Sequence, residues 1–252
     1  MHPTALQNGK LFFETYSKYF DSKKSVKVIE IGSQDVNGSI RSFCPQEFEY
    51  IGLDFVAGKG VDFILTDPYK LPLDDDSVDM IVSSSCFEHS EMFWVLFLEI
   101  ARVLKPGGLF YLNVPSNGMF HRYPVDCWRF YPDSGNALVT WAKRNNYNIS
   151  LVESFINLQQ GEYSSDCHWN DYVAVFSKFK ETPHIFPKKI IDKNTNFING
   201  LSQDTNDFIK KAEISEDFWK LWQTKIILND STISDVQKID WINRIVNNIK
   251  SA

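Results

Sequence analysis

Residues 26–38, VKVIEIGSQDVNG, decide the fold expected of this chain. The run 26–31 is apolar and rich in β-branched side chains, which is typical of a buried strand, and it ends at Gly32 among small and polar residues. The next such run, 50–53, ends on Asp54, where a carboxylate can accept hydrogen bonds from ribose hydroxyls. Strand, glycine turn and acid together predict a cofactor that contains a nucleoside.

The chemistry of the glycine loop separates two classes of cofactor. A dinucleotide fold needs the pattern G-x-G-x-x-G to close its backbone on a pyrophosphate, whereas this loop has only Gly32 and Gly38, with Asp35 between them. A carboxylate there would repel a pyrophosphate but could accept hydrogen bonds from a cationic amino-acid tail. Glu30 adds a second acid, so the loop favours S-adenosylmethionine.

Further segments then follow in one order. They are residues 28–32 (VIEIG), 50–54 (YIGLD), 66–73 (TDPYKLPL), 77–82 (SVDMIV), 87–89 (FEH) and 101–108 (ARVLKPGG). This ordered set, within residues 26–115, resembles the class I S-adenosylmethionine-dependent methyltransferases. The resemblance implies an α/β fold with a doubly wound, seven-stranded, mostly parallel Rossmann-like sheet in a domain of residues 1–180, followed by a helical extension, 181–252.

The resemblance also assigns residues to the cofactor. Those expected to bind it are Glu30, Gly32, Ser33, Asp35, Gly38, Asp54, Phe55, Asp67, Pro68 and Ser84. Asp67 matches the acid that binds the adenine amino group in such enzymes; the alternative is an aspartate that forms a turn before proline.

Hydrophobic periodicity predicts the remaining elements. Helices are expected at residues 11–20, 39–43, 92–104 and 134–144, and strands at 61–65, 78–82, 109–114, 149–154 and 171–177. The helix at 11–20 could form a lid over the cofactor or, as we favour, pack on the sheet. Two or three helices are expected after residue 180.

Residues 118–133, GMFHRYPVDCWRFYPD, stand where the resembling enzymes place their acceptor-binding segment. Aromatic rings beside charged groups suit a polyol such as a sugar. We expect His121 and Tyr123 near the acceptor, whereas Asp126, Trp128 and Arg129 have mainly structural roles, with an ion pair between Asp126 and Arg129.

A sugar hydroxyl needs a base to become a good nucleophile, and imidazole titrates in a useful range. His121 is the predicted base and His168 the runner-up, with Asp126 or Asp166 orienting the ring. Glu88 and His89 could form an acid–base pair, but we favour a structural or cofactor-edge role for them.

No metal ion is expected. The acidic run 74–76 is typical of a solvated loop, and Asp166, His168 and Asp171 could hold a metal only with support from a further cluster. The cysteines at positions 44, 86, 127 and 167 are widely spaced, which argues against a disulfide framework or a structural zinc site.

The net charge of -6 argues against a broad basic face for nucleic acid. A run of apolar residues long enough to span a bilayer is lacking, and a cytoplasmic protein is expected. The predicted function is O-methylation of a sugar or sugar nucleotide in capsule or lipopolysaccharide biosynthesis. The alternatives are N- or O-methylation of another small metabolite and a non-catalytic protein that binds the cofactor or a partner protein. The extension is expected to form a lid or a homo-oligomer contact.

Overall fold

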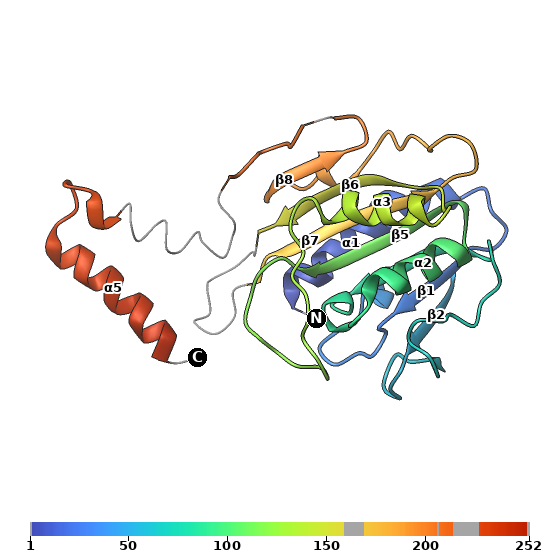
Figure 1. The fold of residues 1–252 in the computed structure, drawn as a ribbon, viewed down its shortest axis with the longest axis horizontal. Coiled ribbons are helices and arrows are strands. Elements are labelled where there is room, and N and C mark those ends of the chain that lie inside the picture. The colour runs from blue at the N-terminus through green and yellow to red at the C-terminus, as the bar shows by residue number, and fades with distance from the viewer. Residues whose placement is uncertain (1, 159–168, 206, 214–226, 251–252) are drawn as a thin grey trace.

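Eight strands form one mixed sheet in the computed structural model, which describes residues 2–158, 169–205, 207–213 and 227–250 (Figure 1). The strands are β1 (Lys27–Ile31), β2 (Glu49–Asp54), β3 (Phe63–Ile64), β4 (Val78–Ser84), β5 (Leu104–Pro115), β6 (Ile149–Asn157), β7 (Asp171–Lys178) and β8 (Phe197–Ser202). Their order across the sheet is β3-β2-β1-β4-β5-β7-β6-β8.

The direction of the strands confirms the predicted doubly wound, mostly parallel fold. The first five strands in this order pair in parallel, whereas β7 is antiparallel to β5 and β6, and β8 is antiparallel to β6. The chain moves outward from β1 through β2 to β3 and then returns to β4 on the other side of β1. Ligands of open α/β sheets bind at such a switch point, beyond the carboxyl ends of β1 and β4.

Helices cover both faces of the sheet (Figure 1). The α-helices are α1 (Pro3–Tyr16), α2 (Phe93–Val103), α3 (Ser134–Arg144) and α5 (Asp235–Lys250), and the 3-10 helices are η1 (Ser17–Phe20), η2 (Ile40–Phe43), η3 (Phe87–His89) and η4 (Ile190–Asp192). One apolar core lies between α2, α3 and the sheet, and a second contains α1, η4 and the opposite face. The sheet, whose strand ends carry the site, therefore lies between two separately packed cores.

The first helix begins eight residues earlier than predicted and packs on the sheet. Its Phe12 ring stacks on Tyr111 of β5, with 4.7 Å between ring centroids. The early turns escaped prediction because their buried side chains include polar Thr4 and Asn8, which hide the apolar period. Gly9 is needed there, since a Cβ atom would lie 2.4 Å from Ile40 Cγ2.

The sheet has eight strands instead of the predicted seven. The additional strand, β8, reads FINGLS, and its Asn199 adopts φ 50° before Gly200. The prediction of a helical extension is wrong for these residues. Strand β3 has two residues, fewer than the five predicted at 61–65. Strand β5 starts at Leu104 instead of Leu109, because the segment before Leu109 stays paired with β4 through a register shift.

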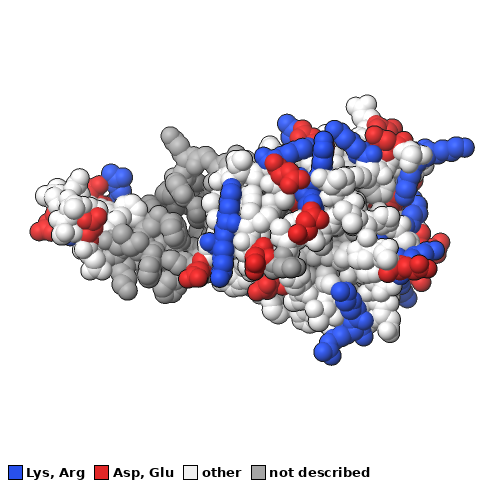
Figure 2. Space-filling view, turned by 90° about the horizontal axis from the view of Figure 1, so that it is seen from above, with Lys and Arg blue, Asp and Glu red and all other residues white. Residues whose placement is uncertain are grey.

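Charged side chains of both signs intermingle on the molecular face that Figure 2 shows. Neither sign dominates a continuous area of this face, in keeping with a modest net charge. Within the described ranges, the helices are too short or too polar to cross a lipid bilayer.

Candidate cofactor and acceptor site

The turn after β1 requires glycine at its first position. Gly32 has φ 78°, and its amide donates a hydrogen bond to the carbonyl of Leu53 at 3.0 Å. A Cβ atom on Gly32 would lie 2.6 Å from Cys86 Cβ and Sγ, closer than packed atoms approach. The turn therefore brings the loop after β1 directly against the loop after β4.

Three buried polar side chains with unpaired atoms lie at this edge of the sheet. Glu30 of β1 is 2% exposed, and its Oε2 has no hydrogen-bond partner among the described residues; the same is true of the hydroxyls of Ser33 and Ser84. Burial raises the pKa of Glu30 to about 7, against a smaller opposing effect of Tyr50 and Arg41. Since unpaired buried polar atoms are costly, this edge is suited to a polar ligand.

Asp35 organises the loop that the sequence assigned to the cofactor tail. Its carboxylate accepts a hydrogen bond from the Gly38 amide at 2.7 Å and pairs with Lys59 Nζ at 2.6 Å. The hydrogen bond from Lys59 and that from Gly38 lower the pKa of Asp35. Lys59 is 81% exposed, so a cationic ligand could replace it at low cost.

The other predicted cofactor residues lie along the β2 and β3 side of the crevice. Asp54 is buried at the end of β2 and accepts hydrogen bonds from the amides of Gln34 at 3.0 Å and Val56 at 3.2 Å. Phe55 beside it is 48% exposed and presents an apolar surface. Asp67 is exposed and accepts from the Tyr69 amide at 2.8 Å, the turn geometry that was the alternative to adenine binding.

A pocket of about 410 Å³ opens beside this edge. It is lined by His2, Asn37, Ser85, Glu88, Pro115, His121, Trp169 and Asp171. These residues come from the N-terminus, the β1 loop, the carboxyl end of β4 and β5, the 118–133 segment and the start of β7. The pocket is thus placed to hold a small molecule next to the cofactor crevice.

Asp126 holds the 118–133 segment together. It accepts from the His121 amide at 2.7 Å, lies 3.3 Å from His121 Nδ1, and accepts two hydrogen bonds from Arg129 at 2.6 and 2.9 Å. Burial alone would raise the pKa of Asp126, but the hydrogen bonds from Arg129 and His121 outweigh it and lower the pKa to about 2. The predicted ion pair with Arg129 is confirmed, while Tyr123 remains 57% exposed.

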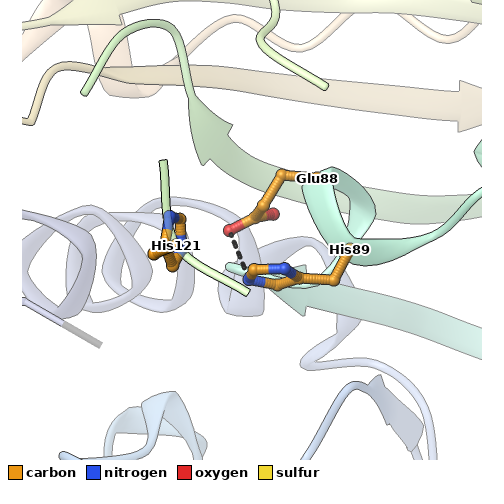
Figure 3. Close-up of side chains that lie close together, drawn as sticks. All are labelled: Glu88, His89 and His121. Atoms are coloured by element: carbon orange, nitrogen blue, oxygen red, sulfur yellow. Dashed lines mark ion pairs between the residues drawn. The ribbon is translucent and has the colours of Figure 1, made fainter. Parts of the chain in front are cut away.

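Glu88 and His89 lie close to His121 (Figure 3). Glu88 is 1% exposed, its Oε2 lacks a partner among the described residues, and burial raises its pKa to about 8. His89 Nε2 lies 3.7 Å from Glu88 Oε1, and burial lowers the pKa of this imidazole. The 118–133 segment is tied to η3, because the amides of Cys127 and Trp128 donate to the Glu88 carbonyl.

Several predicted residues lie elsewhere. His168 and Asp166 fall outside the described residues. In the acidic run after Leu73, Asp75 pairs with Arg102 and Asp76 with Lys178, each at 2.7 Å. Sequence reasoning missed His2, whose Nε2 lies 3.1 Å from Asp171 Oδ1, because nothing in the pattern around position 2 signals a pocket.

Comparison with known proteins identifies part of the chain. Residues 35–112 match the sequence profile of a methyltransferase domain. An uncharacterized methyltransferase of Mycobacterium ulcerans is 41% identical over 114 residues, which are 42% of this chain and 44% of that protein. The phthiotriol/phenolphthiotriol dimycocerosates methyltransferase of Mycobacterium tuberculosis is 32% identical over 96 residues, 36% of this chain and 32% of that protein.

A solved structure has a similar fold. The 1,6-didemethyltoxoflavin-N1-methyltransferase of Burkholderia thailandensis, solved with 1,6-didemethyltoxoflavin and S-adenosylhomocysteine bound, superposes with a TM-score of 0.52 at 14% identity. The match covers 70% of this chain and 79% of that one. The curated relatives are matched over less than half of their own length, from 27% to 44% in those compared. Residues 35–112 therefore match a methyltransferase domain, and the described part of the chain has the Rossmann-like fold that methyltransferases share.

Proposed function

We propose that this protein is an S-adenosylmethionine-dependent methyltransferase that acts on a small molecule. The observation that carries the proposal is the group of unpaired, buried polar atoms on Glu30, Ser33 and Ser84 at the switch point of the sheet, next to the 410 Å³ pocket. Such atoms are suited to a polar ligand at the position where this fold binds one. The cofactor, when bound, supplies a methyl group on a positively charged sulfur.

The residues of the crevice fit the parts of that cofactor. Glu30 and the loop residues Gly32, Ser33, Asp35 and Gly38 would hold the amino-acid tail, since carboxylates attract its ammonium group. At the end of β2, Asp54 would accept the ribose hydroxyls and Phe55 would cover one face of the base. Asp67 and Pro68 would border the adenine, and Ser84 the methionine end.

For the acceptor, we propose a hydroxyl of a sugar or sugar nucleotide, used in capsule or lipopolysaccharide biosynthesis. The pocket wall supports this choice, because it combines the aromatic Trp169 with His121 and Asp171. His121 would take the proton of the hydroxyl at Nε2, while Asp126 holds its Nδ1 side. His168 is the alternative base.

A second candidate is methylation of a different small metabolite. The printed names of the compared proteins include an N1-methyltransferase and a methyltransferase of phthiotriol compounds, so proteins similar to this chain differ in acceptor. A third candidate function is that of a non-catalytic protein that binds the cofactor or a partner protein. The helical extension would then serve as its interface, and in an enzyme as a lid or a homo-oligomer contact.

The first experiment is calorimetry with S-adenosylmethionine, S-adenosylhomocysteine and, as a control, NAD. We expect the first two to bind and NAD not to bind. Asp54→Asn should weaken binding about tenfold or more, because a carboxylate that accepts a ribose hydroxyl contributes on the order of 1.5–3 kcal/mol. Glu49→Gln, which replaces an exposed acid at the start of the same strand β2, is the matched control and should bind normally.

Binding by the wild type would be followed by a screen of nucleotide sugars for methyl transfer. Transfer to a nitrogen-containing metabolite but to none of the sugars would select the second candidate. No binding of either sulfur compound would contradict the proposal.

A further inference from the structure

Two imidazoles and one carboxylate converge beside the pocket (Figure 3). One ligand-type atom from each of Glu88, His89 and His121 lies within 4.8 Å of the other two. The His89 and His121 rings meet edge to face, with 4.8 Å between centroids. Two histidines and a carboxylate are the donor set of many catalytic zinc and non-haem iron sites.

In both histidines, Nε2 is the ring nitrogen without a proton. His89 Nδ1 lies 2.5 Å from the Val125 carbonyl oxygen, which can only accept, so this nitrogen carries the proton. His121 Nδ1 faces the Asp126 carboxylate at 3.3 Å and the Met119 carbonyl at 3.2 Å, which assigns its proton in the same way. Each Nε2 is left with a lone pair, and each ring is oriented by an oxygen, as in metal sites where a second oxygen fixes the ligand histidine.

The third ligand is a buried carboxylate with an unused oxygen. Glu88 is 1% exposed, and its Oε2 has no partner among the described residues. The charged groups around Glu88 include the carboxylates of Asp126 and Asp171 and the Arg129 guanidinium. That guanidinium pairs with Asp126, and Asp171 lies 3.1 Å from His2 Nε2, so neither group occupies the free Glu88 oxygen, which a cation could bind.

From this arrangement we propose that Glu88, His89 and His121 bind a divalent transition metal ion, such as Zn²⁺ or Fe²⁺, through one carboxylate oxygen and two Nε2 atoms. Ligands about 2.1 Å from a metal are about 3.0–3.5 Å apart, so donor atoms that now lie within 4.8 Å of one another must move closer together. His121 is the ligand that can move, because its side chain is 40% exposed. Glu88 and His121 also line the pocket, which leaves the remaining coordination positions open to a ligand there.

An open position next to a methyl donor would serve to hold the acceptor oxygen and lower the pKa of its hydroxyl. This role rests on the proposed function, whereas the metal site does not. With a metal bound, His121 Nε2 is a ligand and cannot act as the base. The metal then takes over the activation that was assigned to His121.

The test uses tag-free, full-length protein that has been dialysed against a chelator and is then titrated with Co²⁺. Binding is followed by calorimetry and by visible absorption, which reports imidazole coordination. We expect one equivalent to bind to the wild type. His121→Ala, His89→Ala and Glu88→Gln should each weaken Co²⁺ binding at least about tenfold, the lower range seen when even an outer-shell partner is lost.

The matched control is His184→Ala, which removes an exposed imidazole far from the pocket lining and should bind Co²⁺ like the wild type. Circular dichroism checks that each variant is folded. If replacement of the more buried Glu88 or His89 unfolds the protein, the result for His121→Ala decides the test, because the His121 side chain is partly exposed. No binding to the wild type at millimolar Co²⁺, or binding that the His121 variant retains, would overturn the site. Binding of S-adenosylmethionine by the wild type is measured separately, so failure of the metal site and failure of the proposed function give different results.

Discussion

At the residue scale, buried carboxyl groups differ in whether their oxygens are paired. Burial raises the pKa of Glu153 as it does those of Glu30 and Glu88. The Glu153 oxygens, however, accept hydrogen bonds from the Tyr16 hydroxyl and from two amides of η4, which explains the residue as a structural link. Glu30 and Glu88 each have one oxygen without a hydrogen-bond partner in the part of the chain that the structure describes, and both lie at the site. Pairing, not burial, therefore separates the structural acid from the two candidate ligand-binding acids.

The raised pKa of Glu30 predicts how the stability of the ligand-free protein depends on pH. Its ordinary pKa is 4.5 and its folded value is about 7, so between these pH values the folded state retains a proton that the unfolded chain has released. The free energy of unfolding should thus fall as pH rises through this window, by up to about 3 kcal/mol. Glu30→Gln should lack this loss. The stability of the variant relative to the wild type should therefore be higher at pH 8 than at pH 5.

Urea unfolding at pH 5 and pH 8 measures the effect, since other titrating groups cancel between wild type and variant. Glu49→Gln replaces an exposed glutamate on the neighbouring strand β2 and should follow the wild type at both pH values. An equal stability difference at the two pH values for Glu30→Gln would contradict the raised pKa.

At the element scale, prediction from sequence succeeded where an element carried a clear apolar pattern. Strand β4 and helix α3 were found nearly to the residue, because strand side chains buried on both faces and an amphipathic helix each leave a clear pattern. The start of α1 was missed because its buried face carries an amide: Asn8 bonds to Asn113 at 2.9 Å. Strand β8 was missed because its position depends on pairing with β6, which a local pattern does not contain.

A buried hydroxyl links helix α1 to strand β6, and removal of this hydroxyl should lower stability. Tyr16 donates to Glu153 Oε1 at 2.5 Å, in a region where both side chains are fully buried. Tyr16→Phe keeps the ring but removes a hydrogen bond to a buried acid, which is expected to cost about 1.5–3 kcal/mol. Denaturant unfolding of the variant provides the measurement.

Tyr19→Phe is the matched control, one turn further along the chain. Among the residues that the structure describes, its hydroxyl bonds only to the backbone of Lys188, and the ring is 37% exposed, so the loss should stay below about 0.5 kcal/mol. If the two variants were equally stable, the Tyr16 hydroxyl would not link α1 to β6.

At the scale of the whole molecule, the site is assembled from segments that are far apart in sequence. His2 meets Asp171 across 169 positions, and Glu88 meets His121 through the folding of the 118–133 segment onto η3. The cofactor side of the site could be predicted because strand, loop and acid follow one another locally. The group of Glu88, His89 and His121 could not, since its geometry arises only when β4, η3 and the later segment pack together.

The contacts of the extension suggest where the methyltransferase domain ends, and truncation tests it. The boundary predicted at residue 180 would remove Phe186, Ile190, Ile191 and Phe197, which are buried in the core beneath α1, and also both amides that bond Glu153. Burial of these side chains contributes about 1.5–3 kcal/mol each, together comparable to the stability of a whole domain. Residues 1–180 alone should therefore fail to fold.

A chain of residues 1–213 should melt within a few degrees of the full protein, because none of the described side chains of α5 is buried. Figure 1 shows this helix lying away from the sheet. Thermal unfolding followed by circular dichroism compares the three lengths. A cooperative, native-like transition of residues 1–180 would instead place the boundary at 180, and loss of folding in residues 1–213 would mean that the end of the chain stabilises the sheet.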